Sequence, residues 1–152
     1  MRTAVAAAGV AVAVALVSTV CGYAVAAGAG DGPRPLGPGL VTVRVTTHYS
    51  EFSHVLDDLH VYKGTVVRFV IVNDDPIHHE FIVGPPAVHA EHEKGHEATH
   101  PPVPGEVSVD PNDTGETFYR FDAVGPIEYA CHLPGHYAYG MHGEITVDPL
   151  PT

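Results

Sequence analysis

The sequence has no tryptophan, two cysteines, two methionines and only seven basic residues (Lys plus Arg) among its 152 residues. Those basic residues stand against 18 acidic ones, for a net charge of -11, which excludes a nucleic-acid partner because such binding needs clustered Lys and Arg. Two cysteines cannot form a disulfide framework, and Cys21 lies in an apolar leader while Cys131 is near the C-terminus. We therefore expect Cys131 to be a lone thiol.

Glycine and proline are abundant instead, at 16 and 14 residues, with 45% hydrophobic residues. This composition favours short strands joined by turns over helical bundles. Val41, Val43 and Val45 alternate with polar residues, as in a half-buried strand. The β-branched run 65–73 is apolar on both faces and predicts a central strand. Together with expected strands at 60–62, 79–83, 106–109, 117–121, 127–131 and 143–147, these segments predict an all-β fold, a Greek-key β-sandwich.

The N-terminal segment 1–29 is read as a signal peptide or an N-terminal membrane anchor, since no charged residue occurs from Thr3 to Gly30. We favour cleavage after Ala26; retention as a membrane tether and lipidation at Cys21 are the alternatives. Residues 30–39 are rich in Pro and Gly and are expected to form an unpaired linker before a domain at 40–150. All three readings predict an exported protein, in the periplasm or cell envelope or secreted.

Four histidines recur at intervals of three or four residues between Val88 and Pro101. On a helix this spacing would place them on one face, so we expect a short helix or an irregular loop inserted between strands. The segment is either a solvated polar loop or a second metal site for copper or zinc. The four residues are His89, His92, His96 and His100.

The segment 129–147 gathers a thiol, an imidazole and a thioether in one loop, at Cys131, His136 and Met141. Two His and one Cys in a plane with a weak axial Met make a type 1 copper site. The missing histidine is expected at His79, because the period of two residues in a strand lets His79 and Cys131 point into the same core. A buried cysteine and a core methionine are the ordinary alternatives for these residues, and the joint spacing favours metal binding.

His79-Glu80-Phe81, followed by Cys131-x4-His136-x4-Met141-x-Gly143, resembles the pattern of the cupredoxins, the plastocyanin and azurin family of small blue copper proteins. The resemblance covers roughly 41–147 and implies a Greek-key sandwich holding one type 1 copper. It implies that His79, Cys131 and His136 hold the metal in the plane and that Met141 is axial. His78 is an alternative to His79, but the family's His directly precedes Glu-Phe, which favours His79.

Two functions are consistent with this pattern. The first, which we favour from the sequence, is a one-electron carrier with His136 as the electron port and an apolar docking patch for an unidentified redox partner protein. The second is a copper-handling protein that buffers, stores or delivers the metal, with the histidine segment as collector. The docking patch would comprise Leu133, Pro134, His136 and Tyr137.

Enzymatic activity is not expected. The multicopper oxidases have a similar ligand loop with His directly before the Cys, where this chain has Ala130. Their trinuclear cluster and the copper site of copper and zinc superoxide dismutases use His-x-His pairs, which the sequence lacks. The binuclear copper centre of cytochrome oxidase needs a second Cys in the same loop.

Overall fold

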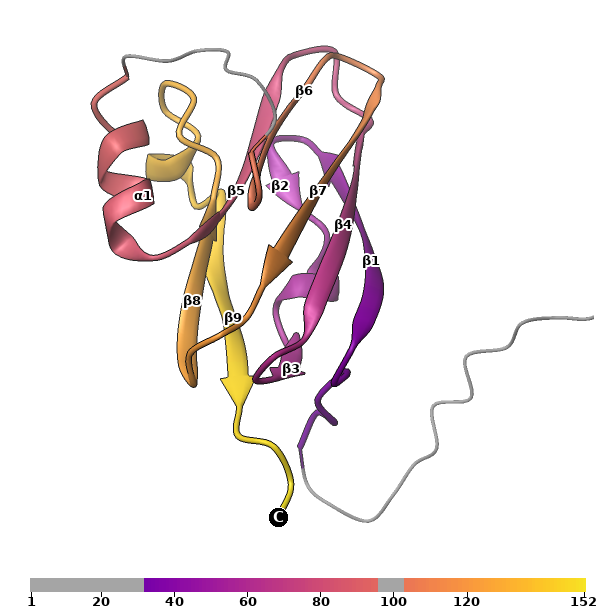
Figure 1. Ribbon diagram of the computed structural model, residues 1–152. Helices are drawn as coiled ribbons and strands as arrows, with labels where there is room; N and C mark the ends of the chain where they lie inside the picture. The colour runs from indigo at the N-terminus through magenta and orange to yellow at the C-terminus, as the bar shows by residue number, and fades with distance from the viewer. Residues whose placement is uncertain (1–31, 96–102) are drawn as a thin grey trace, which may run out of the picture. The chain divides into compact units, whose positions relative to one another are not determined.

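The computed structural model describes residues 32–95 and 103–152, which form two facing sheets (Figure 1). Predictions on the leader, including Cys21 and the cleavage site, lie outside the described residues. The four-stranded sheet has the order β2-β1-β4-β7, with β1 (Leu40–His48), β2 (Glu51–Phe52), β4 (Val66–Asn73) and β7 (Thr114–Arg120). The five-stranded sheet has the order β3-β9-β8-β5-β6, with β3 (His60–Tyr62), β5 (His79–Gly84), β6 (Glu106–Val109), β8 (Gly125–Ala130) and β9 (His142–Asp148).

These two sheets confirm the predicted all-β Greek-key sandwich. The expected strands at 60–62 and 106–109 match β3 and β6 in both bounds, and the other expected strands differ only at their ends. The side chains that alternate inward from both sheets form the core, in which Phe69, Phe81 and Phe121 are fully buried. Burying each of these rings contributes about 2–3 kcal/mol to folding.

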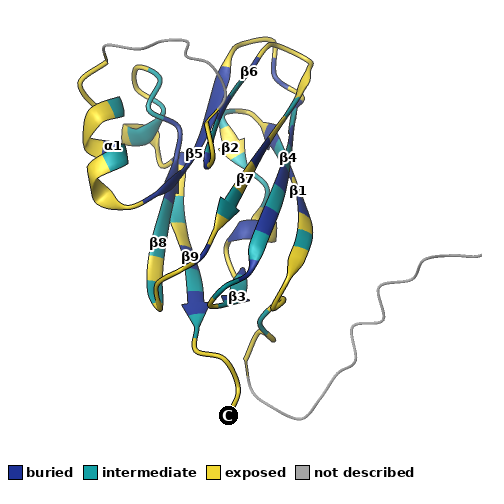
Figure 2. Cartoon of the chain, viewed as in Figure 1, coloured by how far each residue is buried: buried dark blue, intermediate teal, exposed yellow. Residues whose placement is uncertain are grey.

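The strand that is buried on both faces is β5, and not the run 65–73. That run becomes β4, which lies between β1 and β7 as a central strand should, but every second residue of it is half-exposed. All six residues of β5 are buried, as its dark blue colour shows in Figure 2. The predicted central strand is confirmed. Apolar residues on both of its faces do not mean that both faces are buried, because β-branched residues tolerate a half-exposed face.

Leu36, within the segment expected to be an unpaired linker, forms an isolated parallel bridge with Val61. Its N–H donates to the carbonyl of His60 at 2.8 Å, and its carbonyl accepts from the N–H of Tyr62 at 2.9 Å. The expectation is therefore wrong at this residue. Proline removes only its own N–H, and the leucine between prolines keeps both backbone groups for pairing.

The inserted histidine segment begins with a short helix, α1 (Pro86–His92), as expected. Pro86 occupies the first turn, where its missing N–H is not needed. The helix contains His89 and His92, whereas His96 and His100 lie outside the described residues. In the described part of the chain, no helix has the length and apolar character needed to cross a membrane.

Candidate metal centre

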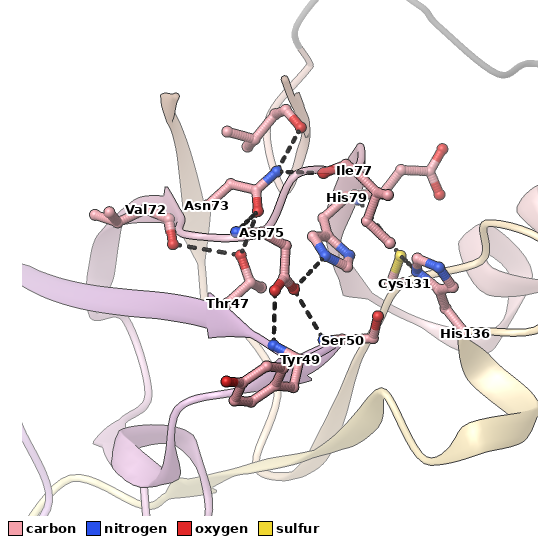
Figure 3. Close-up of polar contacts among 12 residues, drawn as sticks. Thr47, Tyr49, Ser50, Val72, Asn73, Asp75, Ile77, His79, Cys131 and His136 are labelled. Carbon is pink, nitrogen blue, oxygen red and sulfur yellow. Dashed lines mark hydrogen bonds and ion pairs between the residues drawn. The ribbon is translucent and has the colours of Figure 1, made fainter. Parts of the chain in front are cut away.

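Three side chains from different parts of the chain converge at one end of the sandwich. His79 is the first residue of β5, Cys131 follows β8 directly, and His136 lies on the loop between β8 and β9. One potential ligand atom from each lies within 4.8 Å of those of the other two. Sγ of Cys131 is 3.2 Å from Nδ1 of His136 (Figure 3), and the two imidazole rings have centroids 5.0 Å apart.

Met141 closes the same loop. Its N–H donates to the carbonyl of His136 at 3.1 Å, and its carbonyl accepts from the N–H of Cys131 at 3.0 Å. The Met141 side chain is only 1% exposed. Gly140, with φ of 97°, ends the short 3-10 helix η2 (Tyr137–Tyr139) and turns the chain back into β9. One hairpin therefore carries three of the four predicted ligands, and its backbone bonds hold them close together.

A turn at Leu133 to His136 presents the histidine of this loop. The N–H of His136 donates to the carbonyl of Leu133 at 2.9 Å, and Gly135 has φ of 90°, which the third position of a type II turn requires. Pro134 and Gly135 are the two central residues of this turn. His136 is half-buried beside the exposed Pro134, so one edge of its ring faces the surface.

The Cys131 thiol is fully buried, and its surroundings keep it protonated until a metal binds. Burial raises its pKa to about 11, and the nearby Glu80 carboxylate adds to this. The backbone N–H groups of Glu80, at 3.4 Å from Sγ, and of Leu133 act in the opposite direction. A metal would displace the thiol proton, and these two N–H groups would then stabilise the thiolate.

His79 is fully buried and shows how a metal would fit. Its Nε2 lies 2.8 Å from Oδ2 of Asp75, while its Nδ1 is buried and has no hydrogen-bond partner among the residues that the structure describes. A ring whose outer N–H donates to a carboxylate and whose other nitrogen is free is the usual arrangement of a metal-binding histidine. Burial also lowers the pKa of His136, so that its imidazole is neutral near pH 7. Two imidazoles, a thiol and a thioether therefore form a donor set suited to copper.

The alternative ligand, His78, points elsewhere. Its side chain is 61% exposed, and its Nδ1 lies 3.1 Å from a carboxylate oxygen of Asp110. Successive residues of a strand face opposite sides, so only one of the two adjacent histidines can reach the site. The geometry selects His79.

Asp75 is held by the turn between β1 and β2. Its two carboxylate oxygens accept from the N–H groups of Tyr49 at 2.7 Å and Ser50 at 2.8 Å (Figure 3). Both turn residues have positive φ, 55° and 57°, which directs their N–H groups to one side as an anion-binding concavity. Burial by itself would raise the pKa of Asp75, but these two N–H groups and His79 bring it below its ordinary value.

The buried side-chain amide of Asn73 holds the segment that contains Asp75. Asn73 accepts from the N–H of Asp75 at 3.0 Å and donates from Nδ2 to the carbonyls of Ile77, Val109 and Asp110. These bonds join the end of β4 to the end of β6 beneath the site. The backbone that carries His79 is thus tied to three other segments.

The histidine segment does not present its first two histidines to solvent. His89 is 3% exposed, and its Nδ1 lies 2.9 Å from Nε2 of His132. His92 contacts Glu106, with Nε2 3.1 Å from Oε2. His89 and His92 both contact His132 and so share one face of α1, as the spacing predicted, whereas the other two histidines of that expected face lie outside the described residues.

Sequence reasoning missed Asp75 and Asn73, and it gave His132 no role. Asp75 lies in Asp74-Asp75-Pro76, a sequence typical of a turn, and no local pattern distinguishes a turn aspartate that is buried from one that is not. His132 directly follows Cys131 in the sequence, which places it next to the predicted site. In the structure, burial and the adjacent His89 and His92 lower the pKa of His132 to about 4.

Sequence relatives establish the family. A protein of Pseudomonas aeruginosa called copper-resistant cuproprotein CopI is 32% identical over 123 residues, covering 60% of this chain and 68% of that protein. The chain belongs to the CopI family. The CopI proteins of Rubrivivax gelatinosus and Vibrio cholerae are 37% and 32% identical over 90 and 87 residues. This chain covers 54% and 52% of them, so it spans about half the length of these two CopI relatives.

Solved structures agree with this family in fold. The reduced auracyanin of Roseiflexus castenholzii superposes with a TM-score of 0.59 at 19% identity, covering 71% of this chain and 97% of that one. Auracyanin B gives a TM-score of 0.55 at 24% identity, covering 79% and 96%. The described domain is a cupredoxin fold, as the sequence resemblance implied. No protein-family model matches this chain.

Proposed function

We propose that the chain binds one copper ion through His79, Cys131, His136 and Met141 and works in copper tolerance outside the cytoplasm. The observation that carries the proposal is the cluster of the buried His79 and Cys131 with the half-buried His136, in which Nδ1 of His79 has no partner within the described part of the chain. Copper held there would exchange one electron between Cu(I) and Cu(II). The chain's own part is to exclude water, to release the Cys131 proton and to keep the His136 imidazole neutral.

Copper tolerance is favoured because the relatives at 32–37% identity are called copper-resistant cuproproteins. The auracyanins, at 24% identity or less, support the fold only. Handling of copper by buffering or delivery therefore takes precedence over the electron carrier that the sequence favoured.

Electron transfer to a redox partner protein is the second candidate, and the rigidity of the site favours it. Asp75 holds the His79 ring through a hydrogen bond. Two backbone hydrogen bonds, from Cys131 to Met141 and from Met141 to His136, close the loop. Ligands fixed in this way change little when copper changes its charge. The half-buried ring of His136 beside Leu133, Pro134 and Tyr137 would be the docking surface.

Leu133→Asp separates the two candidates. If two copies exchange electrons through the docking patch, a charge there repels the same charge on the other copy, and the electron self-exchange rate falls about tenfold or more. Copper tolerance does not need that patch, so a host lacking the gene, given the Leu133→Asp chain, should grow in copper as it does with the wild type. Failure of growth together with slower self-exchange would favour the carrier.

A further inference from the structure

Glu80 carries a buried carboxylate beside the first site, which is the site of His79, Cys131, His136 and Met141. It follows His79 in β5, and only 5% of the residue is exposed. Side chains alternate along a strand, so the Glu80 side chain leaves β5 on the face opposite to His79. The helix α1 packs on β5 (Figure 1), and all six residues of the strand are buried. A carboxylate is therefore held out of bulk water next to the metal ligands.

Two hydrogen bonds attach Glu80 to the ligand loop. Its backbone N–H donates to Sγ of Cys131 at 3.4 Å, and its Oε2 accepts from the N–H of His132 at 3.3 Å. The carboxylate is therefore bonded to the peptide unit that directly follows the ligand cysteine. One residue thus places a hydrogen-bond donor on the ligand sulfur and a carboxylate close behind it.

We infer that Glu80 determines which oxidation state of copper the first site prefers, and that it favours Cu(II) over Cu(I). The inference rests on the proposed copper binding and deepens it. Reduction of bound Cu(II) adds one electron, which a one-electron reductant supplies, and no bond within the chain breaks. The site is therefore more negative by one charge with Cu(I) than with Cu(II).

Burial makes that additional negative charge unfavourable. The Cys131 thiolate, Asp75 behind His79 and Glu80 beside the sulfur supply three negative groups, and Asp75 is also only 5% exposed. One net negative charge remains with Cu(II), and two remain with Cu(I). Like charges that are shielded from water repel strongly, so the more positive ion is favoured. Removing the Glu80 charge should therefore shift the preference toward Cu(I).

The test compares Glu80→Gln with the wild type in affinity for Cu(II) and for Cu(I), by competition with a chelator for each ion, and in reduction potential. Glutamine removes the charge, and its carbonyl oxygen can still accept from the N–H of His132. The ratio of Cu(II) to Cu(I) affinity should fall about tenfold, which corresponds to a reduction potential about 59 mV higher. The visible absorption should be retained, because no ligand is changed.

Two further variants show whether the buried charge is the cause. Glu144→Gln removes the same charge from an exposed residue of β9, where water and salt screen it, so the ratio should change by less than about twofold. Glu80→Asp keeps the charge, and its ratio should stay within about threefold of the wild type. A loss of about tenfold in Glu80→Asp would overturn the inference, even if Glu80→Gln did not fold.

An unchanged ratio in Glu80→Gln, or an equal change in Glu144→Gln, would also overturn the inference while leaving copper binding at the first site in place. Failure of the proposed function gives a different result. The wild type itself would then bind no copper and develop no intense visible absorption, and both proposals would be wrong.

Discussion

Cys131→Ser should abolish the intense visible absorption of the copper-loaded chain and weaken copper binding at the first site at least about 100-fold. The absorption arises from charge transfer between thiolate and Cu(II), which a hydroxyl cannot supply, and a serine is a poor ligand for copper. Titration with Cu(II) under visible and EPR detection measures both effects.

The substitution should leave the metal-free fold nearly unchanged. A hydroxyl in this position can accept from the Glu80 N–H and donate to Nδ1 of His136, as the thiol does. We expect the free energy of unfolding to change by about 1 kcal/mol or less. Cys21→Ser is the matched control and should keep both the absorption and the affinity. A variant at Cys131 that stays intensely coloured would contradict the ligand assignment.

Asp75→Asn should weaken copper binding about 10–100-fold, the usual effect of losing a carboxylate behind a metal-binding histidine. It should also lower the free energy of unfolding of the metal-free protein by about 3–5 kcal/mol. Both effects have one cause. Three N–H groups donate to the two oxygens of Asp75, and an amide replaces one oxygen by another donor.

The measurements are copper affinity by competition with a chelator and unfolding by urea. Asp74→Asn is the control, since Asp74 precedes Asp75 in the chain but its side chain is exposed. It should change the free energy of unfolding by less than about 0.5 kcal/mol. Equal behaviour of the two variants would show that Asp75 does not position His79.

The strands and the loop that carries Cys131, His136 and Met141 could be predicted because their signals are local. The alternation of valine with polar residues indicates β1. The equal spacing of Cys131, His136 and Met141 indicates a hairpin loop, which contains a turn at Gly135. His79 could be added to this predicted ligand set because side chains alternate along a strand with a period of two residues, which lets His79 and Cys131 point into the same core. The role of these four side chains as copper ligands stays a prediction, although the structure brings His79, Cys131 and His136 together.

The supports of the site could not be predicted, because they depend on contacts between distant segments. Asp75 meets the turn at Tyr49 and Ser50 across 25 residues of chain. His89 is buried against His132, 43 residues away. Neither contact leaves a period or a motif in the sequence, so the polar residues involved look like ordinary surface residues.

A crystal structure of the Cu(II)-loaded chain, with anomalous scattering at the copper edge, tests the central claim most directly. The first site should show one strong peak within bonding distance of Nδ1 of His79, Sγ of Cys131 and Nδ1 of His136, with Nε2 of His79 still on Asp75. Copper bound elsewhere, with these three atoms arranged as they are without metal, would contradict the account.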